Sequence, residues 1–169
     1  LSIVASFSQV NSKVEIAAPG VSVLSTVPTN TAISATLTSG ASVTTVVPMD
    51  NFDPPAAPVT GNLVNCGLAK DAAACGDALD KMCVIERGEV SFAQKALSCQ
   101  EAGGVGAVVY QNATTAGPVI GTLGSTHLDI PVVGTDRATG TALLAKIGES
   151  ATPMATSSSG VKVVSGRAA

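Results

Sequence analysis

The chain is poor in aromatic and charged side chains. Aromatic residues make up 2% of its 169 residues, tryptophan is absent, and charged residues make up 12%, about half of the usual share. The core must therefore be built from aliphatic residues such as valine, alanine and leucine, which suit β-sheets. The formal net charge of −3 supplies no positive field that would attract a phosphate backbone, so we expect no nucleic-acid partner.

Long apolar runs and catalytic motifs are also missing. No stretch reaches the roughly 18 to 20 apolar residues that cross a bilayer, so no membrane partner is expected. The chain has one histidine, His127, and no Gly-x-Ser-x-Gly motif to position a serine nucleophile. A small hydrolase that uses His127 with Asp129 or Asp136 and a serine is an alternative, but a lone histidine in a polar loop favours a plain surface position.

Four cysteines fall within one short segment, namely Cys66, Cys75, Cys83 and Cys99. Their spacing matches no Cys-x-x-Cys zinc or redox pattern, which favours two disulfides over four free thiols and indicates a secreted or periplasmic protein. Three pairings are possible. We favour Cys66 with Cys83 and Cys75 with Cys99. In this interpretation Cys66 and Cys75 lie in the loop before the strand that Cys83 opens, and Cys99 lies on the following helix.

The most regular stretch is a βαβ unit at residues 81–110. It begins with an apolar strand over Met82–Glu86 and a turn at Arg87-Gly88. A helix follows, with Ser91 as its N-cap and Gly103-Gly104 at its end. A second strand covers Val105–Tyr110. The unit carries no nucleophile, acid/base pair or metal cluster, which indicates recognition rather than chemistry.

Two helices can be assigned to faces from the apolar pattern. The apolar face of the first helix consists of Phe92, Ala93, Ala96, Leu97 and Cys99. Lys95 and Glu101 are expected on its more solvent-exposed side. After a short strand at Ile130–Gly134, residues 136–147 are predicted to form a second helix that Gly148 ends. The residues of this second helix expected to face inward are Ala138, Ala142, Leu143 and Ile147.

Residues 81–147 resemble the protease-associated domain, or PA domain. Five features carry the resemblance, in order: Cys-Val-Ile-Glu-Arg-Gly at 83–88, Ser-Phe at 91–92 with the lysine at 95, Ala-Gly-Gly at 102–104 with the strand after it, Ile-Pro-Val-Val-Gly at 130–134, and the helix from 137. The resemblance implies a mixed α/β fold, a β-sandwich or open-sided β-barrel flanked by short α-helices. The matching positions expected to be structural are Arg87, Gly88, Phe92, Lys95, Gly103, Gly104, Pro131 and Gly134.

Residues 5–26 carry a second resemblance, to the subtilisin-family segment that precedes the catalytic serine motif. The serine motif Gly-Thr-Ser-Met-Ala does not occur, and neither do that family's aspartate and histidine motifs. The implied arrangement is a PA domain inserted in a subtilisin-like serine protease. We predict that residues 1–28 belong to the catalytic domain, 29–150 to the PA domain, and 151–169 to a linker with a possible final strand.

The two resemblances imply a non-catalytic interaction domain of a secreted serine endopeptidase, which positions protein substrates or controls access to the active site. Its expected partners are protein or peptide substrates and the catalytic domain of the same polypeptide. A free-standing extracellular adhesive or ligand-binding domain is the other alternative. Recognition is expected in two loops, Pro48–Pro58 and Gln111–Asp129, because loops on a rigid scaffold usually carry it. The residues expected to make contact are Gln111, Asn112, Thr126, His127 and Asp129.

No cofactor is expected. Calcium takes about six to eight oxygen ligands, and no EF-hand spacing gathers the aspartates of this chain. The preferred interpretation is that they are solvated loop carboxylates, with calcium as a secondary hypothesis for an exported protease. The aspartates concerned are Asp50, Asp53, Asp71, Asp77 and Asp80.

Overall fold

The computed structural model describes residues 21–26, 33–50, 58–113, 117–157 and 163–167. The chain divides into two compact units, Ile33–Ser157 on the one hand and the two flanks, Leu1–Ala32 and Ser158–Ala169, on the other. In the flanking unit, strand β1 (Val21–Thr26) pairs antiparallel with strand β9 (Val163–Arg167). Most of the segment that resembles subtilisins lies outside the described residues.

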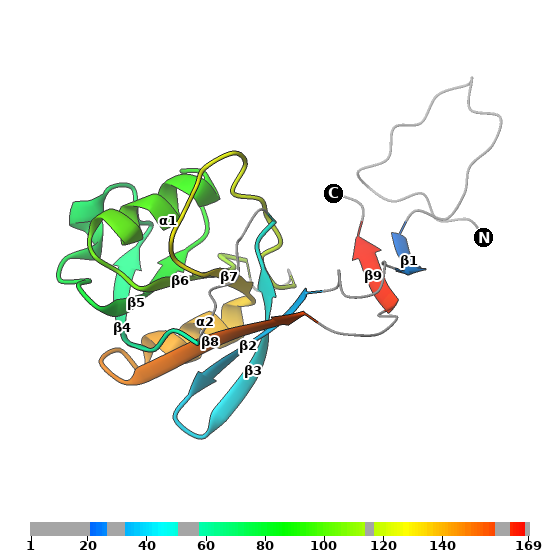
Figure 1. Cartoon of the computed structure of the whole chain (residues 1–169), viewed down its shortest axis with the longest axis horizontal. Helices are drawn as coiled ribbons and strands as arrows, with labels where there is room; N and C mark the ends of the chain where they lie inside the picture. Colours follow the sequence, from blue (N-terminus) through cyan, green and yellow to red (C-terminus); the bar gives the residue numbers. More distant parts are fainter. Residues whose placement is uncertain (1–20, 27–32, 51–57, 114–116, 158–162, 168–169) are drawn as a thin grey trace. The chain divides into compact units, whose positions relative to one another are not determined.

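The unit Ile33–Ser157 is built on a closed barrel of seven strands (Figure 1). In spatial order the strands are β2 (Ile33–Ser39), β3 (Ser42–Pro48), β7 (Val132–Thr135), β6 (Gly106–Tyr110), β5 (Lys81–Glu86), β4 (Gly61–Gly67) and β8 (Ser150–Ser157). Pairing of β8 with β2 closes the ring. The predicted mixed α/β class and the barrel with short flanking helices are confirmed, and the barrel is closed rather than open-sided.

Four neighbouring strands, β4 to β7, run parallel, whereas β2, β3 and β8 form antiparallel pairs. Parallel neighbours need long crossover connections. These are the short 3-10 helix η1 (Ala72–Cys75), the helix α1 (Phe92–Glu101) and the long loop between β6 and β7. A second helix, α2 (Arg137–Leu144), follows β7. The carboxyl ends of all four parallel strands therefore lie at the same edge of the barrel.

The parallel strands are apolar on both faces because each face meets a different core. In β5, Cys83 and Ile85 belong to one core, which also holds Ala96 and Cys99 of α1. The alternate residues of β5 belong to the second core, together with residues of β2, β6 and α2. Burial on both faces explains why β5 and β6 appear in the sequence as continuous apolar runs rather than as alternating patterns.

Helix α1 begins as predicted, but its solvent-exposed face was assigned wrongly. The Ser91 side chain accepts a hydrogen bond from the backbone N–H of Gln94, as an N-cap does. The prediction that Lys95 lies on the more solvent-exposed side is wrong, because Lys95 has 0% exposed surface. The turn after β4 covers this side of the helix, and Lys95 reaches the carbonyl of Leu68 there. Helical periodicity alone gives no information about this distant turn.

Helix α2 turns a different face to the barrel from the one predicted. Leu143 is buried as expected, but Gly140 is buried beside it. A Cβ at Gly140 would overlap with the ring and Cβ of Tyr110, so the glycine allows the helix to approach β6 closely. The inward assignment of three other residues is wrong, since they are exposed: Ala138, Ala142 and Ile147.

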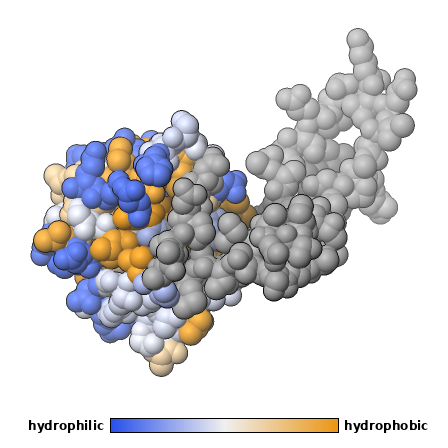
Figure 2. All heavy atoms as spheres, viewed as in Figure 1, coloured by the Kyte–Doolittle hydropathy of each residue, from blue (hydrophilic) through white to orange (hydrophobic). Residues whose placement is uncertain are grey.

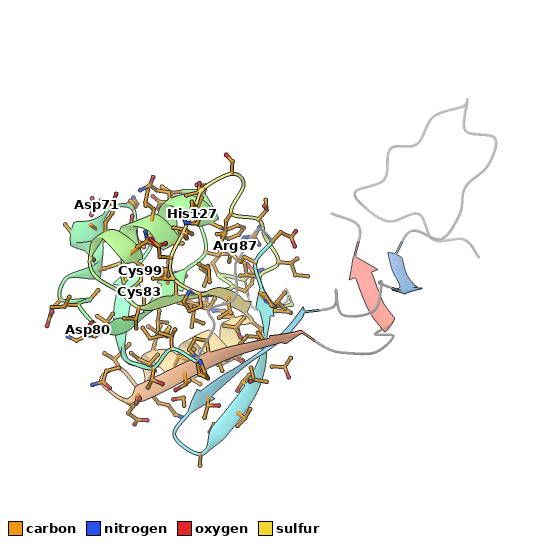
Figure 3. All side chains as sticks on the ribbon, viewed as in Figure 1. Asp71, Asp80, Cys83, Arg87, Cys99 and His127 are labelled. Carbon is orange, nitrogen blue, oxygen red and sulfur yellow. A yellow bond between two sulfur atoms is a disulfide. The ribbon has the colours of Figure 1, made fainter. Side chains whose placement is uncertain are left out.

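Both disulfides are present, but the favoured pairing is wrong: the bonds join Cys66 to Cys75 and Cys83 to Cys99. Cys66 lies in strand β4, not in a loop, and its Cα is 4.1 Å from that of Cys75 in η1. Cys83 of β5 points toward α1, where Cys99 lies directly against it (Figure 3). The missed strand β4 is the cause of the error. A Cβ at Gly104 would overlap with both sulfur atoms of the second bond.

The last strand of the barrel lies in the segment that we predicted as a linker. Strand β8 pairs with β2 from Ala151 to Ser157, so the compact unit extends to Ser157 instead of ending at residue 150. The composition of β8, Ser-Ala-Thr-Pro-Met-Ala-Thr-Ser, has no apolar alternation to reveal it. Among the described residues, no helix has the length and apolar character required to span a membrane.

Candidate functional site

Polar residues gather where the parallel strands end. Arg87 follows β5, Gln111 follows β6, and Arg137 begins α2 after β7. Ligands of parallel sheets and barrels commonly bind at the carboxyl edge, where loops from several strands meet. These residues, and the two loops predicted to carry recognition, are therefore the candidates for a site.

Arg87 and Gln111 hold two strand ends together. The guanidinium of Arg87 donates a hydrogen bond of 2.9 Å to the side-chain oxygen of Gln111. Backbone hydrogen bonds reinforce this contact, from Arg87 to Tyr110 and from Gln111 to Thr135. Gln111 is 4% exposed, which leaves it little surface for a partner. Gln111 therefore shapes the edge, whereas Arg87 holds it in place and remains exposed.

Arg137 links the end of β5 to the loop after β6. Its Nη1 donates to the main-chain oxygen of Asn112 at 2.6 Å and lies 3.6 Å from a carboxylate oxygen of Glu86. Burial raises the pKa of Tyr110, and the negative charge of Glu86 raises it further, whereas the positive charge of Arg137 lowers it. At this part of the carboxyl edge the phenol of Tyr110 therefore stays protonated, and the positive charge of Arg137 offsets the negative charge of Glu86.

A second charged cluster surrounds the turn after β4. Lys95 donates a hydrogen bond of 2.5 Å to the main-chain oxygen of Leu68, and burial lowers the pKa of Lys95. Glu89 and Glu86 oppose this lowering with their negative charge. Glu89 itself forms an exposed ion pair with Lys70. The cluster fastens α1, the turn after β4 and the turn after β5 to one another.

The structure brings the two predicted recognition loops together. The backbone N–H of Asp50 donates to the carbonyl of Gly121 at 2.8 Å, and the N–H of Leu123 donates back to the carbonyl of Asp50 at 3.0 Å. Asp50 and Thr122 form a parallel bridge. Residues 51–57 of the first loop lie outside the described residues. Segments about 70 positions apart in the sequence thus form one continuous surface, which we call the rim surface and define as residues 49–50 and 117–130.

The longer loop is held against the scaffold, although its described residues 117–130 form no helix or strand. Four of its apolar residues are buried: Val119, Leu123, Leu128 and Ile130. At its end the N–H of Asp129 donates to the side chain of Gln100 on α1, at 2.7 Å. Gly121 packs so closely on the ring of Phe92 that a Cβ would overlap with it. Ile120, by contrast, is 66% exposed, so an apolar side chain stands on a fixed backbone.

His127 lies at the outside of this loop beside α1 (Figure 3). Its Nε2 is 3.5 Å from Asp129, and both side chains are about four-fifths exposed, at 81% and 77%. In the part of the chain that the structure describes, no hydroxyl group hydrogen-bonds to this histidine. A triad needs a nucleophile within hydrogen-bond reach of the base and a geometry protected from water. This pair supplies neither, so it does not support the hydrolase alternative.

The aspartates considered for calcium are dispersed in the structure. Asp71 caps η1 by accepting from the N–H of Ala74, and Asp77 pairs with Lys81 at 2.8 Å. Asp53 lies outside the described residues. Among the residues described, the group with metal-like spacing consists of Cys66, Cys75 and Cys83, and these sulfur atoms are engaged in disulfides. The prediction that the domain needs no cofactor stays a prediction.

Apolar side chains are scattered over the barrel. On the face that Figure 2 shows, hydrophobic and hydrophilic residues alternate over the described surface. The large apolar side chains that are exposed come from different elements: Val43, Leu79, Ile120 and Ile147. Of these four side chains, Ile120 lies on the rim surface.

The comparison with protein families agrees with this architecture. The model of the PA domain family matches residues 59–143, half of the chain. The chain belongs to the PA domain family. The matched region begins just before β4 and ends within α2, so it contains the parallel half of the barrel, both disulfides, the carboxyl edge and the rim loop.

Three similar proteins are proteases. Aminopeptidase YwaD of Bacillus subtilis is 32% identical over 85 residues, which are 50% of this chain and 19% of that protein. The structure of BSAP, a zinc aminopeptidase from Bacillus subtilis, has a TM-score of 0.67 at 24% identity. The match covers 83% of this chain and 34% of the BSAP chain, and it supports the fold. The psychrophilic subtilisin-like protease Apa1 of Pseudoalteromonas sp. AS-11 has a TM-score of 0.69 at 31% identity over 96% of this chain and 42% of its own.

This PA domain spans about a fifth of the curated relative that it matches and less than half of the solved proteases. Sequence reasoning named the rim loop as a candidate but missed three contacts at these loops and strand ends. The tie between Arg87 and Gln111 and the contact of Asp50 with Gly121 join residues distant in the sequence, and a single sequence shows no such pairing. The Arg137–Glu86 contact was equally hidden, although both residues stand at the ends of predicted elements.

Proposed function

We propose that this PA domain is a non-catalytic part of a secreted, subtilisin-like serine endopeptidase, and that its rim surface contacts protein substrates on their way to the active site. The observation that carries the proposal is the rim surface itself. Two loops from distant parts of the chain are hydrogen-bonded into one surface, with Ile120 held outward on a backbone anchored to Phe92 and Gln100. A rigid surface of this kind suits recognition of an extended polypeptide.

The choice of parent protease is supported by the extent of similarity. The barrel unit covers about three quarters of the chain, and the similarity to the subtilisin-like protease extends over 96%, which includes flanking residues. The structural match to the zinc aminopeptidase covers 83% of the chain at 24% identity, against 31% identity for the subtilisin-like protease. Two disulfides in a chain of this size support an oxidising, extracytoplasmic location. The complete gene is expected to encode the aspartate and histidine motifs upstream and the serine motif downstream.

The experiment compares protein and small-peptide substrates in the full-length protease. Ile120→Ser removes the exposed apolar contact without touching the core, so kcat/KM on casein should fall about five- to tenfold while kcat/KM on a short chromogenic peptide stays unchanged. Val43→Ser is the matched control, because Val43 is also 66% exposed but lies in the β2–β3 hairpin. Equal losses on both substrates, or the same loss in both variants, would contradict a substrate-positioning role.

The hydrolase alternative has its own test. The 169-residue chain is incubated with casein and with a serine-reactive fluorophosphonate. We expect no cleavage and no labelling. Labelling that His127→Ala abolishes would show that the chain is itself an enzyme.

A further inference from the structure

A groove lies between helix α2 and the β2–β3 hairpin, away from the rim surface. Its volume is about 320 Å³, at the lower end of the range for small-molecule sites. Four apolar side chains line it: Leu37, Ala138, Ala142 and Leu143. Ala138 and Ala142 are the residues that were expected to face the core. Because α2 turns Gly140 to the barrel instead, these short side chains form an open wall.

A buried hydroxyl without a partner also lines the groove. Ser39, the last residue of β2, is 4% exposed, and its Oγ has no hydrogen-bond partner. Leaving a buried hydroxyl unsatisfied is unfavourable, and such groups are rare in native structures. A serine hydroxyl can donate one hydrogen bond and accept two. The groove thus offers a hydrogen-bond donor that the described part of the chain does not use.

A positive charge lies beside the main chain of the same residue. Lys146, just beyond the end of α2, lines the groove, and its Nζ lies 3.5 Å from the main-chain oxygen of Ser39. An ammonium group has three N–H donors. Within the described residues Lys146 forms no ion pair, whereas Lys70 and Lys81 each do. A positive charge and an unsatisfied hydroxyl therefore belong to residues that line the same apolar groove.

We propose that this groove binds the free carboxyl terminus of a peptide that ends in an aliphatic residue. The carboxylate would accept hydrogen bonds from Lys146 and from the hydroxyl of Ser39, and the aliphatic side chain would lie against Leu37 and Ala142. A carboxylate is the complementary group because both polar atoms can donate and one carries a positive charge. This site does not rest on the proposed function, since it lies on a different part of the barrel from the rim surface.

The test uses the 169-residue chain and two probes that differ in one group. N-acetyl-Gly-Ala-Leu with a free acid is titrated into ¹⁵N-labelled protein, followed by the same peptide as its amide. We expect weak binding of the acid, in the millimolar range, with amide shifts at Leu37, Ser39 and Ala142. The amide should bind about tenfold more weakly or not at all. Equal affinity of the two probes, shifts elsewhere, or no binding of the acid overturns the proposal.

Three variants and one control locate the interaction. Ala142→Leu fills the groove from an exposed helical position that tolerates leucine, and it should abolish binding while the fold persists. Lys146→Gln should weaken acid binding about tenfold, while Lys81→Gln removes a lysine charge elsewhere and should leave it unchanged. Ser39→Ala should weaken binding without lowering the melting temperature, because it deletes an unsatisfied hydroxyl. Unaltered binding in Ala142→Leu would place the ligand outside the groove and refute the assignment.

Discussion

The ammonium group of Lys95, on a side chain with 0% exposed surface, donates a hydrogen bond of 2.5 Å to the main-chain oxygen of Leu68. One contact thus joins the first helix to the turn after β4, 27 residues earlier in the chain. The same turn lies within the loop that the Cys66–Cys75 disulfide closes. The lysine of the PA motif consequently acts within the scaffold of the carboxyl edge.

Removing this contact should destabilise the domain. Lys95→Ala leaves a cavity and an unpaired carbonyl at Leu68, and we expect the free energy of unfolding to fall by about 2–4 kcal/mol. Lys95→Met fills the same space but provides no donor, so its loss should be smaller, about 1–2 kcal/mol. Urea unfolding of the two variants measures both values. Wild-type stability in Lys95→Ala would show that the hydrogen bond contributes nothing.

Stability should also depend on pH through Lys95. Burial lowers the pKa of Lys95 below the ordinary lysine value of 10.5. Between the lowered pKa and 10.5, the unfolded chain holds a proton that the folded chain has released, so raising the pH favours the folded state. The unfolding free energy of the wild type minus that of Lys95→Met should therefore increase with pH in this alkaline window. A difference that stays flat would mean that Lys95 keeps its ordinary pKa.

Tyr110 should produce the opposite slope. Burial and the neighbouring Glu86 raise its pKa above the ordinary value of 10.0. Above pH 10.0 the unfolded chain loses the phenolic proton first, so the stabilisation present below that pH is lost as the pH rises through the raised pKa. Tyr110→Phe removes this loss, and its stability should decline less than that of the wild type at alkaline pH. Spectrophotometric titration of the phenol provides an independent check, since it should show the raised pKa directly.

Much of the fold could be predicted because its information is local. Ser91 and the Gly103 turn bound α1 in the sequence as they do in the structure. Strands β4 and β8 were missed for a physical reason. Their residues are mostly small or polar, and long-range pairing with β5 and β2 determines their conformation. The disulfide pairing depended on β4, so this one omission produced the wrong connectivity. The rim surface was likewise half-predicted, since its loops were named but their contact was not.

Gly140 should be required for the packing of α2, although alanine is the better helix former by about 1 kcal/mol. A Cβ at this position would overlap with Tyr110, whose own position is fixed within the second core. Gly140→Ala should therefore lower the melting temperature by several degrees. Gly117→Ala is the matched control, because no atom lies within 4 Å of the Cβ that it adds. If both variants melt like the wild type, helix and strand can separate without cost.

The two disulfides should contribute unequally to stability. Cys83–Cys99 closes a 16-residue separation and Cys66–Cys75 one of 9 residues. The chain-entropy account predicts a loss of roughly 3 kcal/mol for the first bond and slightly less for the second. Burial does not alter this order, because all four cysteines belong to the same core. Paired substitutions by alanine, C83A/C99A and C66A/C75A, measure each loss by urea unfolding. Non-reducing peptide mapping comes first, and a fragment that links Cys66 to Cys83 would invalidate this connectivity and the comparison built on it.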